Sequence, residues 1–330
     1  MPSHPLARGG RLRLLAVAAA LFTVAAGAIG ALSPVAANSD DDIAVRNGPI
    51  AFGRFDPNLG DFSLWTAHAN GSHQRRLTNT PTFMSDWRPD GSGLTFDYFN
   101  GTDQHIATIR RDGSHRRQLT FGHGIQGDPR YSPDGRHVVF DASPLSPSDP
   151  AFQTHIWLMN SDGSHRRQVT RGGFDVEPVF SPDGRHIAFG RIVSFTNFQN
   201  EAVYVVRTDG THLHQLVPPR PALEHPRWSP DGRLLTYNIA PESTGAPGAG
   251  SVFSIHPDGH HQRVLRRATS AWKFTKAVWS PDGRKMLVVC HNVARNIDRI
   301  CQMSPRTAQF RVVVRTPFPV NFPSWGPKRN

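Results

Sequence analysis

A short tight-turn motif recurs along most of this 330-residue chain. Its copies read RPDG at 88–91 and SPDG at 132–135, 181–184, 229–232 and 280–283, and a worn copy, GPK, lies at 326–328. The prolines of successive copies lie between 44 and 51 residues apart. Proline suits the second position of a type I turn, aspartate the third, and glycine the positive φ that follows. Repeats of this period are typical of propeller blades or solenoid arrays.

Each repeat unit has the pattern of four short strands, named a to d here. Strand a ends on an aromatic residue directly before the turn, as at Trp87 and Tyr131, and strand b follows the turn. A second tight turn, such as Asp112-Gly113 or Asp162-Gly163, separates strands c and d. Four-stranded antiparallel units stacked around an axis form a β-propeller, so six copies of the motif predict six blades.

The two ends of the repeat region complete each other. The segment IAFGR follows an SPDG turn at 187–191 but occurs without one at 50–54. The first unit therefore supplies strands b, c and d, and its strand a is at 322–326, near the end of the chain. A linear solenoid would need capping repeats, and none is visible. We therefore predict an all-β, six-bladed propeller over 48–330, closed by the C-terminal strand joining the first blade, which removes free sheet edges.

The motif WSPDGR at 228–233, with LW at 64–65, DGS at 112–114 and RQLT at 117–120, resembles the WD-type repeat of TolB-like propellers. The resemblance covers 48–327 and implies the propeller fold. TolB proteins also have an α/β domain before the propeller, whereas residues 38–47 form only a short linker here, so the resemblance concerns the propeller part alone. Some lyases of pectin fragments have similar repeats and use histidine-bound metal at the channel.

The N-terminal segment has the three regions of a secretory signal peptide. Arg8, Arg11 and Arg13 precede an apolar run at 14–32, and Val35-Ala36-Ala37 is a cleavage pattern. We expect residues 1–37 to be removed on export, leaving no membrane span; an uncut anchor is the alternative, since the run could nearly cross a bilayer. The mature chain is then expected in the periplasm, the cell envelope or the extracellular space, as a monomer.

The chain is strongly basic, with a net charge of +11. Residues 1–37 contain those three arginines and no acidic residue, so their removal leaves +8. A basic balance often indicates nucleic acid, but export argues against it. The expected partners are a protein or an anionic cell-envelope polymer.

Loop lengths predict which face of the propeller binds. The a–b and c–d loops are uniform tight turns, whereas the b–c loops on the other face vary, for example at 143–153, 194–201 and 241–250. Variable loops on a rigid scaffold are common binding sites. Strand a lines the channel and starts at this face.

The residue five positions before each motif proline changes chemically while the motif stays constant. These residues include Asp128, Glu177, His225 and Lys276. Together with Gln126 and Asp175 they predict a polar ligand site at the channel mouth. The alternative is a solvated channel with scattered salt bridges.

Other conspicuous residues have structural explanations. His73, His115, His165, His212 and His260 follow the c–d turns of different blades and cannot converge on one ion, so no metal site is predicted from them. The arginine pairs at 75–76, 116–117 and 166–167 fall on strand d, where they either protect the edge or form a rim for an anionic polymer. Cys290 and Cys301 lie on neighbouring strands and either form a disulfide or remain free.

No hydrolase signature or phosphate-binding loop is present, and no cofactor is expected. The leading hypothesis is an exported, non-enzymatic propeller that binds a protein or an anionic envelope polymer through its variable-loop face and channel mouth. One alternative is a lyase or hydrolase acting on acidic oligosaccharides, with His225 as its candidate metal ligand. Another is a sensor module that binds a small ligand or sugar in the same pocket.

Overall fold

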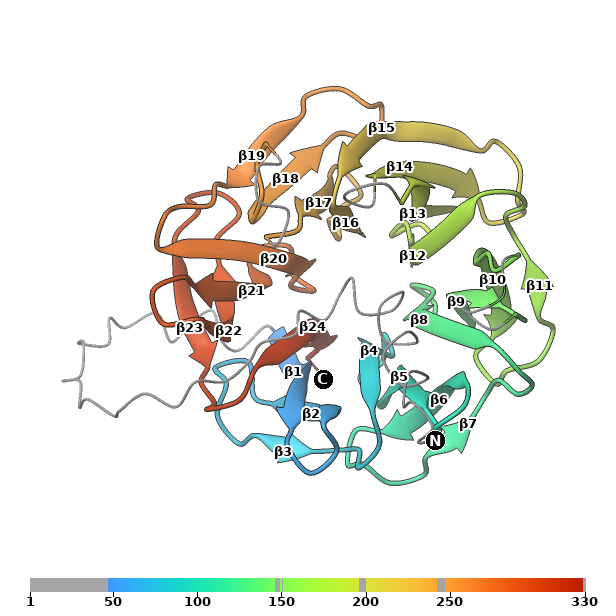
Figure 1. The fold of residues 1–330 in the computed structure, drawn as a ribbon, viewed down its shortest axis with the longest axis horizontal. Helices are drawn as coiled ribbons and strands as arrows, with labels where there is room; N and C mark the ends of the chain where they lie inside the picture. The colour runs from blue at the N-terminus through green and yellow to red at the C-terminus, as the bar shows by residue number, and fades with distance from the viewer. Residues whose placement is uncertain (1–46, 146–148, 150, 196–199, 242–246, 329–330) are drawn as a thin grey trace, which may run out of the picture.

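A computed structural model describes residues 47–145, 149, 151–195, 200–241 and 247–328. Every regular element in this part of the chain is a strand, and the strands surround a central axis (Figure 1). They are β1 (Asn47–Asp56), β2 (Asp61–Ala67), β3 (Arg75–Arg76), β4 (Thr82–Trp87), β5 (Gly93–Phe99), β6 (Gln104–Arg110), β7 (Arg117–Gln118), β8 (Ile125–Tyr131), β9 (His137–Ser143), β10 (His155–Asn160), β11 (Arg167–Gln168), β12 (Phe174–Phe180), β13 (His186–Ser194), β14 (Asn200–Arg207), β15 (His214–Pro221), β16 (Leu223–Trp228), β17 (Leu235–Ile239), β18 (Ser251–Ile255), β19 (Arg263–Arg266), β20 (Trp272–Trp279), β21 (Met286–Asn292), β22 (Ile297–Met303), β23 (Phe310–Val314) and β24 (Val320–Pro327).

The strands form antiparallel, four-stranded meanders, as the repeat predicts. Four sheets have four strands each, in the orders β24-β1-β2-β3, β12-β13-β14-β15, β16-β17-β18-β19 and β20-β21-β22-β23. The remaining eight-stranded sheet consists of the meanders β4–β7 and β8–β11, joined by one parallel pair between Gln104 and Ile125. The described residues thus form five sheets in an all-β propeller.

The ring closes as predicted, between the first and last strands. β24 pairs antiparallel with β1, placing Trp325 opposite Ile50 and Val320 opposite Arg54. The Trp325 indole Nε1 donates a hydrogen bond to the Gly48 carbonyl at 3.2 Å. Both partners of that first pair belong to an apolar cluster that also includes Leu287 of β21, so the closing strand is held by packing as well as by its ladder.

The SPDG turns link strands a and b, and serine stabilises them. Ser132 Oγ donates to the Asp134 carboxylate at 2.5 Å and accepts the His137 backbone N–H at 2.9 Å. The same pair of bonds recurs at Ser181, Ser229 and Ser280. The glycine that ends each turn has positive φ, 68° at Gly135, as expected for this turn.

Arginines on the outermost strands connect neighbouring units. Arg117 Nη2 donates to the Asp162 carbonyl at 3.2 Å, Arg75 bonds the Asp112 carbonyl, and Arg167 Nη2 reaches the Thr208 carbonyl at 2.5 Å. These bonds give the strand-d arginines a third role beside the two proposed from sequence: they link neighbouring units through hydrogen bonds.

The exposed histidines after the c–d turns lie on separate units, with positive φ at His73, His115, His165 and His212. In the fifth unit the equivalent residue is His261 and not His260, because His261 has the matching φ of 56°.

Cys290 on β21 and Cys301 on β22 form a disulfide, with their Cα atoms 5.8 Å apart. In the part of the chain that the structure describes, no helix is long and apolar enough to cross a membrane. The expected signal peptide at 1–37 and most of the linker lie outside the described residues.

Candidate functional site

Each innermost strand contains an irregularity at the position that the sequence marked as variable. Asp128, Glu177, His225, Lys276 and Phe322 all have φ between 46° and 57°. The register of the innermost strand shifts at each of these places, as in a β-bulge. A left-handed conformation in a residue other than glycine costs on the order of 1–3 kcal/mol, and such residues cluster at functional sites.

A cavity of about 150 Å³ lies at the variable-loop end of the ring, where these irregularities occur. Its walls come from the starts of β4, β8, β12 and β16, from Phe322 of β24, and from the b–c side of the neighbouring strands. The volume is below the roughly 300–1,000 Å³ of pockets that hold drug-sized ligands. The cavity therefore suits one side chain or one small group.

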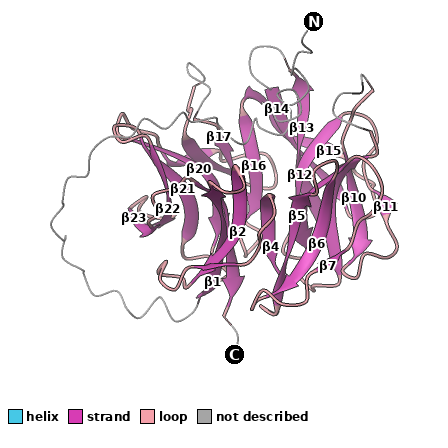
Figure 2. Cartoon of the chain, turned by 60° about the horizontal axis from the view of Figure 1, so that its bottom comes forward, coloured by secondary structure: helices cyan, strands magenta, loops and turns pink. Residues whose placement is uncertain are grey.

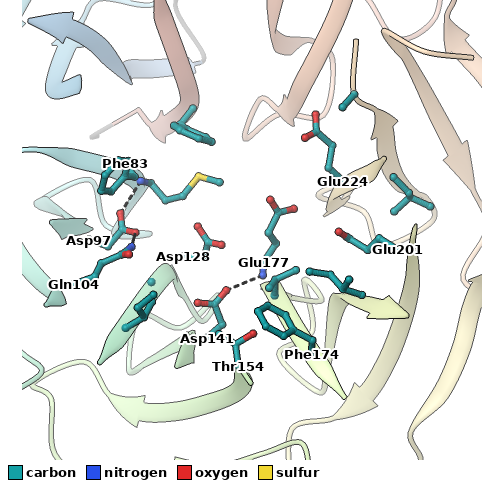
Figure 3. A pocket seen from close by; sticks show the side chains of 18 of the residues that line it. Phe83, Asp97, Gln104, Asp128, Asp141, Thr154, Phe174, Glu177, Glu201 and Glu224 are labelled. Carbon is teal, nitrogen blue, oxygen red and sulfur yellow. Dashed lines mark hydrogen bonds between the residues drawn. The ribbon is translucent and has the colours of Figure 1, made fainter. Parts of the chain in front are cut away.

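Six carboxylic acids line this cavity, and Figure 3 shows their side chains directed toward a common space. Aromatic and aliphatic side chains form the rest of the wall, among them Phe83, Phe174 and Phe322. The acids are Asp97, Asp128, Asp141, Glu177, Glu201 and Glu224.

Three of the acids stabilise the backbone irregularities. Asp97 accepts the Met84 N–H at 2.6 Å and Asp141 accepts the Glu177 N–H at 3.1 Å. Glu177 in turn accepts the His225 N–H at 2.6 Å. A bulge turns a backbone N–H away from the ladder, and these carboxylates supply the missing acceptors. Part of the acidic cluster is therefore structural.

Glu201 differs from these acids because one of its oxygens has no partner. Its side chain is 2% exposed, and Oε1 makes no hydrogen bond within the described part of the chain. It occupies the space in front of Gly190, where a Cβ atom would lie 1.9 Å from Oε1. The residues equivalent to Gly190 on β5 and β9 are Asp97 and Asp141. In this unit the acid comes from strand c, and glycine on strand b makes room for it.

Two further buried acceptors on the cavity wall also lack partners among the described residues. They are Gln104 Oε1 and Thr154 Oγ1, on side chains that are 3% and 4% exposed. Gln104 Nε2 donates a hydrogen bond to Asp97, so only the amide oxygen of Gln104 lacks a partner. An unpaired buried polar atom costs about 1–3 kcal/mol. Three such acceptors around one space favour a ligand that carries hydrogen-bond donors.

Burial favours the protonated form of the acids in the cavity. It raises the pKa of Asp97 to about 7, and the neighbouring Asp128 carboxylate adds to the rise. Burial also raises the pKa of Asp141 and Glu201 well above the usual values, with like charges nearby adding to the effect. The Asp128 and Asp141 side chains share a hydrogen bond, which requires a proton between them. The cluster thus carries fewer negative charges at neutral pH than it has carboxyl groups.

Positive charge lies deeper in the channel. Arg130 Nη1 donates to the Ser85 carbonyl at 2.8 Å, and Arg227 Nη1 donates to the Pro226 carbonyl at 2.7 Å. Burial lowers the pKa of Arg227 to about 9, with Arg130 contributing, so it remains protonated at neutral pH. Their charges partly balance the acids without entering the cavity wall.

The sequence-predicted residues fall into two groups, and the first group lies at or beside the cavity. Asp128 and Glu177 line it. His225 Nδ1 lies 2.9 Å from Glu177 Oε1, outside hydrogen-bonding geometry, and burial lowers the His225 pKa to about 3, so the ring is neutral and the pair is no salt bridge. The Lys276 ammonium lies 4.6 Å from the centroid of the Phe322 ring.

Gln126 and Asp175 form the second group, and neither lines the cavity. The Gln126 amide oxygen lies 3.0 Å from His105 Nδ1. The Asp175 carboxylate is paired with Arg191 through two bonds of 2.6 and 2.9 Å. Both residues lie two positions before a bulge, and the bulge breaks the alternation that would place them on the same side as Asp128 and Glu177.

Four acids of the cavity were not predicted from the sequence: Asp97, Asp141, Glu201 and Glu224. Asp97 and Asp141 each follow the aromatic residue of strand b, after Phe96 and Phe140. Comparing that position between repeats would have found them. Within the described residues, no group of three or more His, Cys, Asp or Glu side chains is arranged to hold a metal ion.

Comparisons with known proteins agree with this architecture. Residues 56–191 match the family model described as the TolB beta propeller domain. Over these residues the chain is similar to TolB β-propeller domains. An uncharacterized protein of Agrobacterium fabrum is 27% identical over 188 residues, which cover 54% of this chain and 62% of that protein, so the match spans less than two thirds of the relative.

Solved structures share this propeller fold at low identity. TolB from Acinetobacter baumannii superposes with a TM-score of 0.70 at 19% identity, over 85% of this chain and 67% of that one. An oligogalacturonate lyase in complex with manganese gives a TM-score of 0.51 at 15% identity, over 81% and 74% of the two chains. At such identities the likeness shows the fold alone, because one fold supports many functions.

Proposed function

We propose that this chain is an extracytoplasmic, non-enzymatic binding propeller that holds a protein partner on its variable-loop face. A positively charged side chain of the partner enters the cavity. For this proposal we count the meanders β4–β7 and β8–β11 as separate blades, because a single residue pair joins them. The ring then has six blades.

The unpaired Glu201 Oε1 in an acidic cavity is the observation that carries the proposal. A buried carboxylate oxygen without a donor is costly, and a lysine ammonium or arginine guanidinium supplies both the donor and the opposite charge. Apolar walls such as Phe83 and Phe174 would cover the aliphatic stem of that side chain. The size of the cavity fits one such group.

The same lining disfavours an anionic polymer at this mouth. Six carboxyl groups face the space, and a polyanion would leave their acceptor atoms without donors. The disulfide between Cys290 and Cys301 supports an oxidising compartment outside the cytoplasm.

Affinity capture from an envelope extract tests this function, with the full chain and two variants as bait. Glu201→Gln keeps the size of this side chain but prevents it from taking a negative charge beside a bound cation. Asp209→Asn is the matched control, because Asp209 lies in an exposed c–d turn whose counterpart in the first unit is already Asn70-Gly71. We expect a partner that the wild type and Asp209→Asn recover and that Glu201→Gln loses. No partner above background, or equal loss with both variants, would refute the proposal.

A further inference from the structure

A second charged region lies on the opposite end of the ring, among the tight turns. It is a groove of about 800 Å³ between the meanders β4–β7 and β8–β11, named the arginine groove here. Five arginines and one histidine line it, together with two aspartates. The basic residues are Arg75, Arg88, Arg110, Arg111, Arg117 and His115, and the acidic ones are Asp112 and Asp162.

The repeat supplies internal controls for this groove. The corresponding groove between β8–β11 and β12–β15 is lined by one arginine, Arg167, one histidine, His137, and two aspartates. The groove between β16–β19 and β20–β23 has two arginines and two aspartates. Of these three equivalent grooves, only the arginine groove has a clear excess of positive charge. The excess is therefore a property of this place and not of the turn motif.

Two departures from the repeat produce much of the excess. Arg88 stands where Ser132, Ser181, Ser229 and Ser280 stand in the other turns, so this turn lacks the two serine bonds found there. Arg111 stands where the next unit has Ser161. A residue that breaks a local rule without a stabilising gain is often functional.

The arginines differ in how much they are already engaged. Arg75 and Arg117 donate hydrogen bonds to backbone carbonyl groups of the neighbouring turns. Arg88 Nε lies 3.1 Å from Asp90 Oδ2, and its guanidinium lies 5.7 Å from the Tyr131 ring centroid. Arg110 and Arg111 are exposed and form no hydrogen bond or ion pair through their side chains in the part of the chain described.

The two aspartates offset only part of the positive charge of the five arginines. The Asp112 carboxylate accepts the Ser114 N–H at 3.0 Å, and the Asp162 carboxylate accepts the Ser164 N–H at 2.9 Å. Both are therefore held by their own turns. The free donors of the groove are guanidinium groups, whose planar forks match carboxylate and phosphate oxygens.

We propose that the arginine groove binds a chain-like anion with repeated phosphate or carboxylate groups. Charges from several elements spread over this volume suit a linear polyanion better than a single small ion. The site is separate from the cavity, and the proposal does not depend on the function proposed for it.

Titration calorimetry with defined anions tests the groove. The probes are tripolyphosphate, trigalacturonate and inorganic phosphate, and the first two distinguish a phosphate source from a carboxylate source. The test variant combines Arg88→Ser and Arg111→Ser, which install the residues found at Ser132 and Ser161. The control combines Arg166→Ser and Arg233→Ser, two exposed arginines outside the three grooves, with the same change in charge.

We expect at least one of the two three-unit probes, tripolyphosphate or trigalacturonate, to bind more tightly than phosphate. The test variant should weaken that binding by about tenfold or more, equivalent to the loss of one strong contact. The control should change the affinity by less than about twofold. Equal weakening in the control, no effect in the test variant, or phosphate binding as tightly as both three-unit probes would overturn the proposal. Unchanged thermal unfolding shows that the variants are folded, and unchanged binding by Glu201→Gln separates the groove from the cavity.

Discussion

The cavity and the arginine groove lie at opposite ends of one ring and treat charge in opposite ways. The acids of the cavity are buried, so burial raises the pKa of Asp97 to about 7 and protons are shared within the cluster. The arginines of the groove are largely exposed and stay charged. The buried carboxyl groups respond to pH and are little screened by salt, whereas the exposed guanidinium groups are screened by salt and keep their charge near neutral pH. One scaffold can therefore present two sites under separate control.

The largest expected effect tests whether the cavity needs a donor as well as a positive charge. Butylamine should bind the wild type, and Glu201→Gln should weaken its binding roughly tenfold to a hundredfold, because the amide can still accept a hydrogen bond but cannot take the negative charge that pairs with the ammonium. Isothermal titration measures both affinities, with Asp209→Asn as the control. Butyltrimethylammonium carries the charge without an N–H, so equal binding of the two ligands would contradict the role assigned to the unpaired acceptors.

The next effect separates the two regions by ionic strength. Raising NaCl from about 50 to about 500 mM should lower the affinity of the groove for trigalacturonate or tripolyphosphate by about tenfold, because the Debye length shortens severalfold. Butylamine in the buried cavity should change by less than about threefold. The same salt series on both ligands is the measurement. Parallel salt dependence would mean that the cavity is as open to solvent as the groove.

The fold could be predicted from sequence because each unit repeats the same local rules. The turn glycines, the meander order and the closing pair of Ile50 and Trp325 all follow from the motif and its spacing. Two of the cavity residues, Asp128 and Glu177, could be found because they vary where the motif is constant.

The rest of the cavity could not be predicted from the spacing. A bulge adds one residue to the strand and reverses the side-chain alternation, which moved Gln126 and Asp175 away from the cavity. Glu201 belongs to strand c and matters because Gly190 on strand b leaves space for it. That pairing depends on packing between strands in three dimensions. The arginine groove was equally hidden, since it gathers residues from several turns.

A smaller effect is expected from pH on ligand binding in the two regions. Asp97 loses its proton as the pH rises through about 7, which makes the cavity more negative. Butylamine should therefore bind severalfold more tightly at pH 8 than at pH 6. Trigalacturonate remains ionised over this range and the guanidinium groups stay charged, so its binding in the groove should not become tighter as the pH rises. Titrations at both pH values measure the two affinities. An equal increase for both ligands would contradict the predicted difference between the cavity and the groove.

The smallest effect concerns the stability of the unliganded fold. The folded chain keeps a proton on Asp97 up to about pH 7, whereas the unfolded chain releases it near the ordinary value of 3.8. Raising the pH across this window favours the unfolded state, so stability should fall from about pH 4 to pH 7. Asp97→Asn keeps an acceptor for the Met84 N–H without the titration, and should reduce that fall. Asp128 and Asp141 take up part of the same proton, so the difference should be about 1 kcal/mol, below the 1.4 kcal/mol of one full pKa unit. Urea unfolding at both pH values measures it, with Arg88→Ser as a control from the groove. If Asp97→Asn leaves the pH dependence of the unfolding free energy unchanged, the proton lies elsewhere in the cluster.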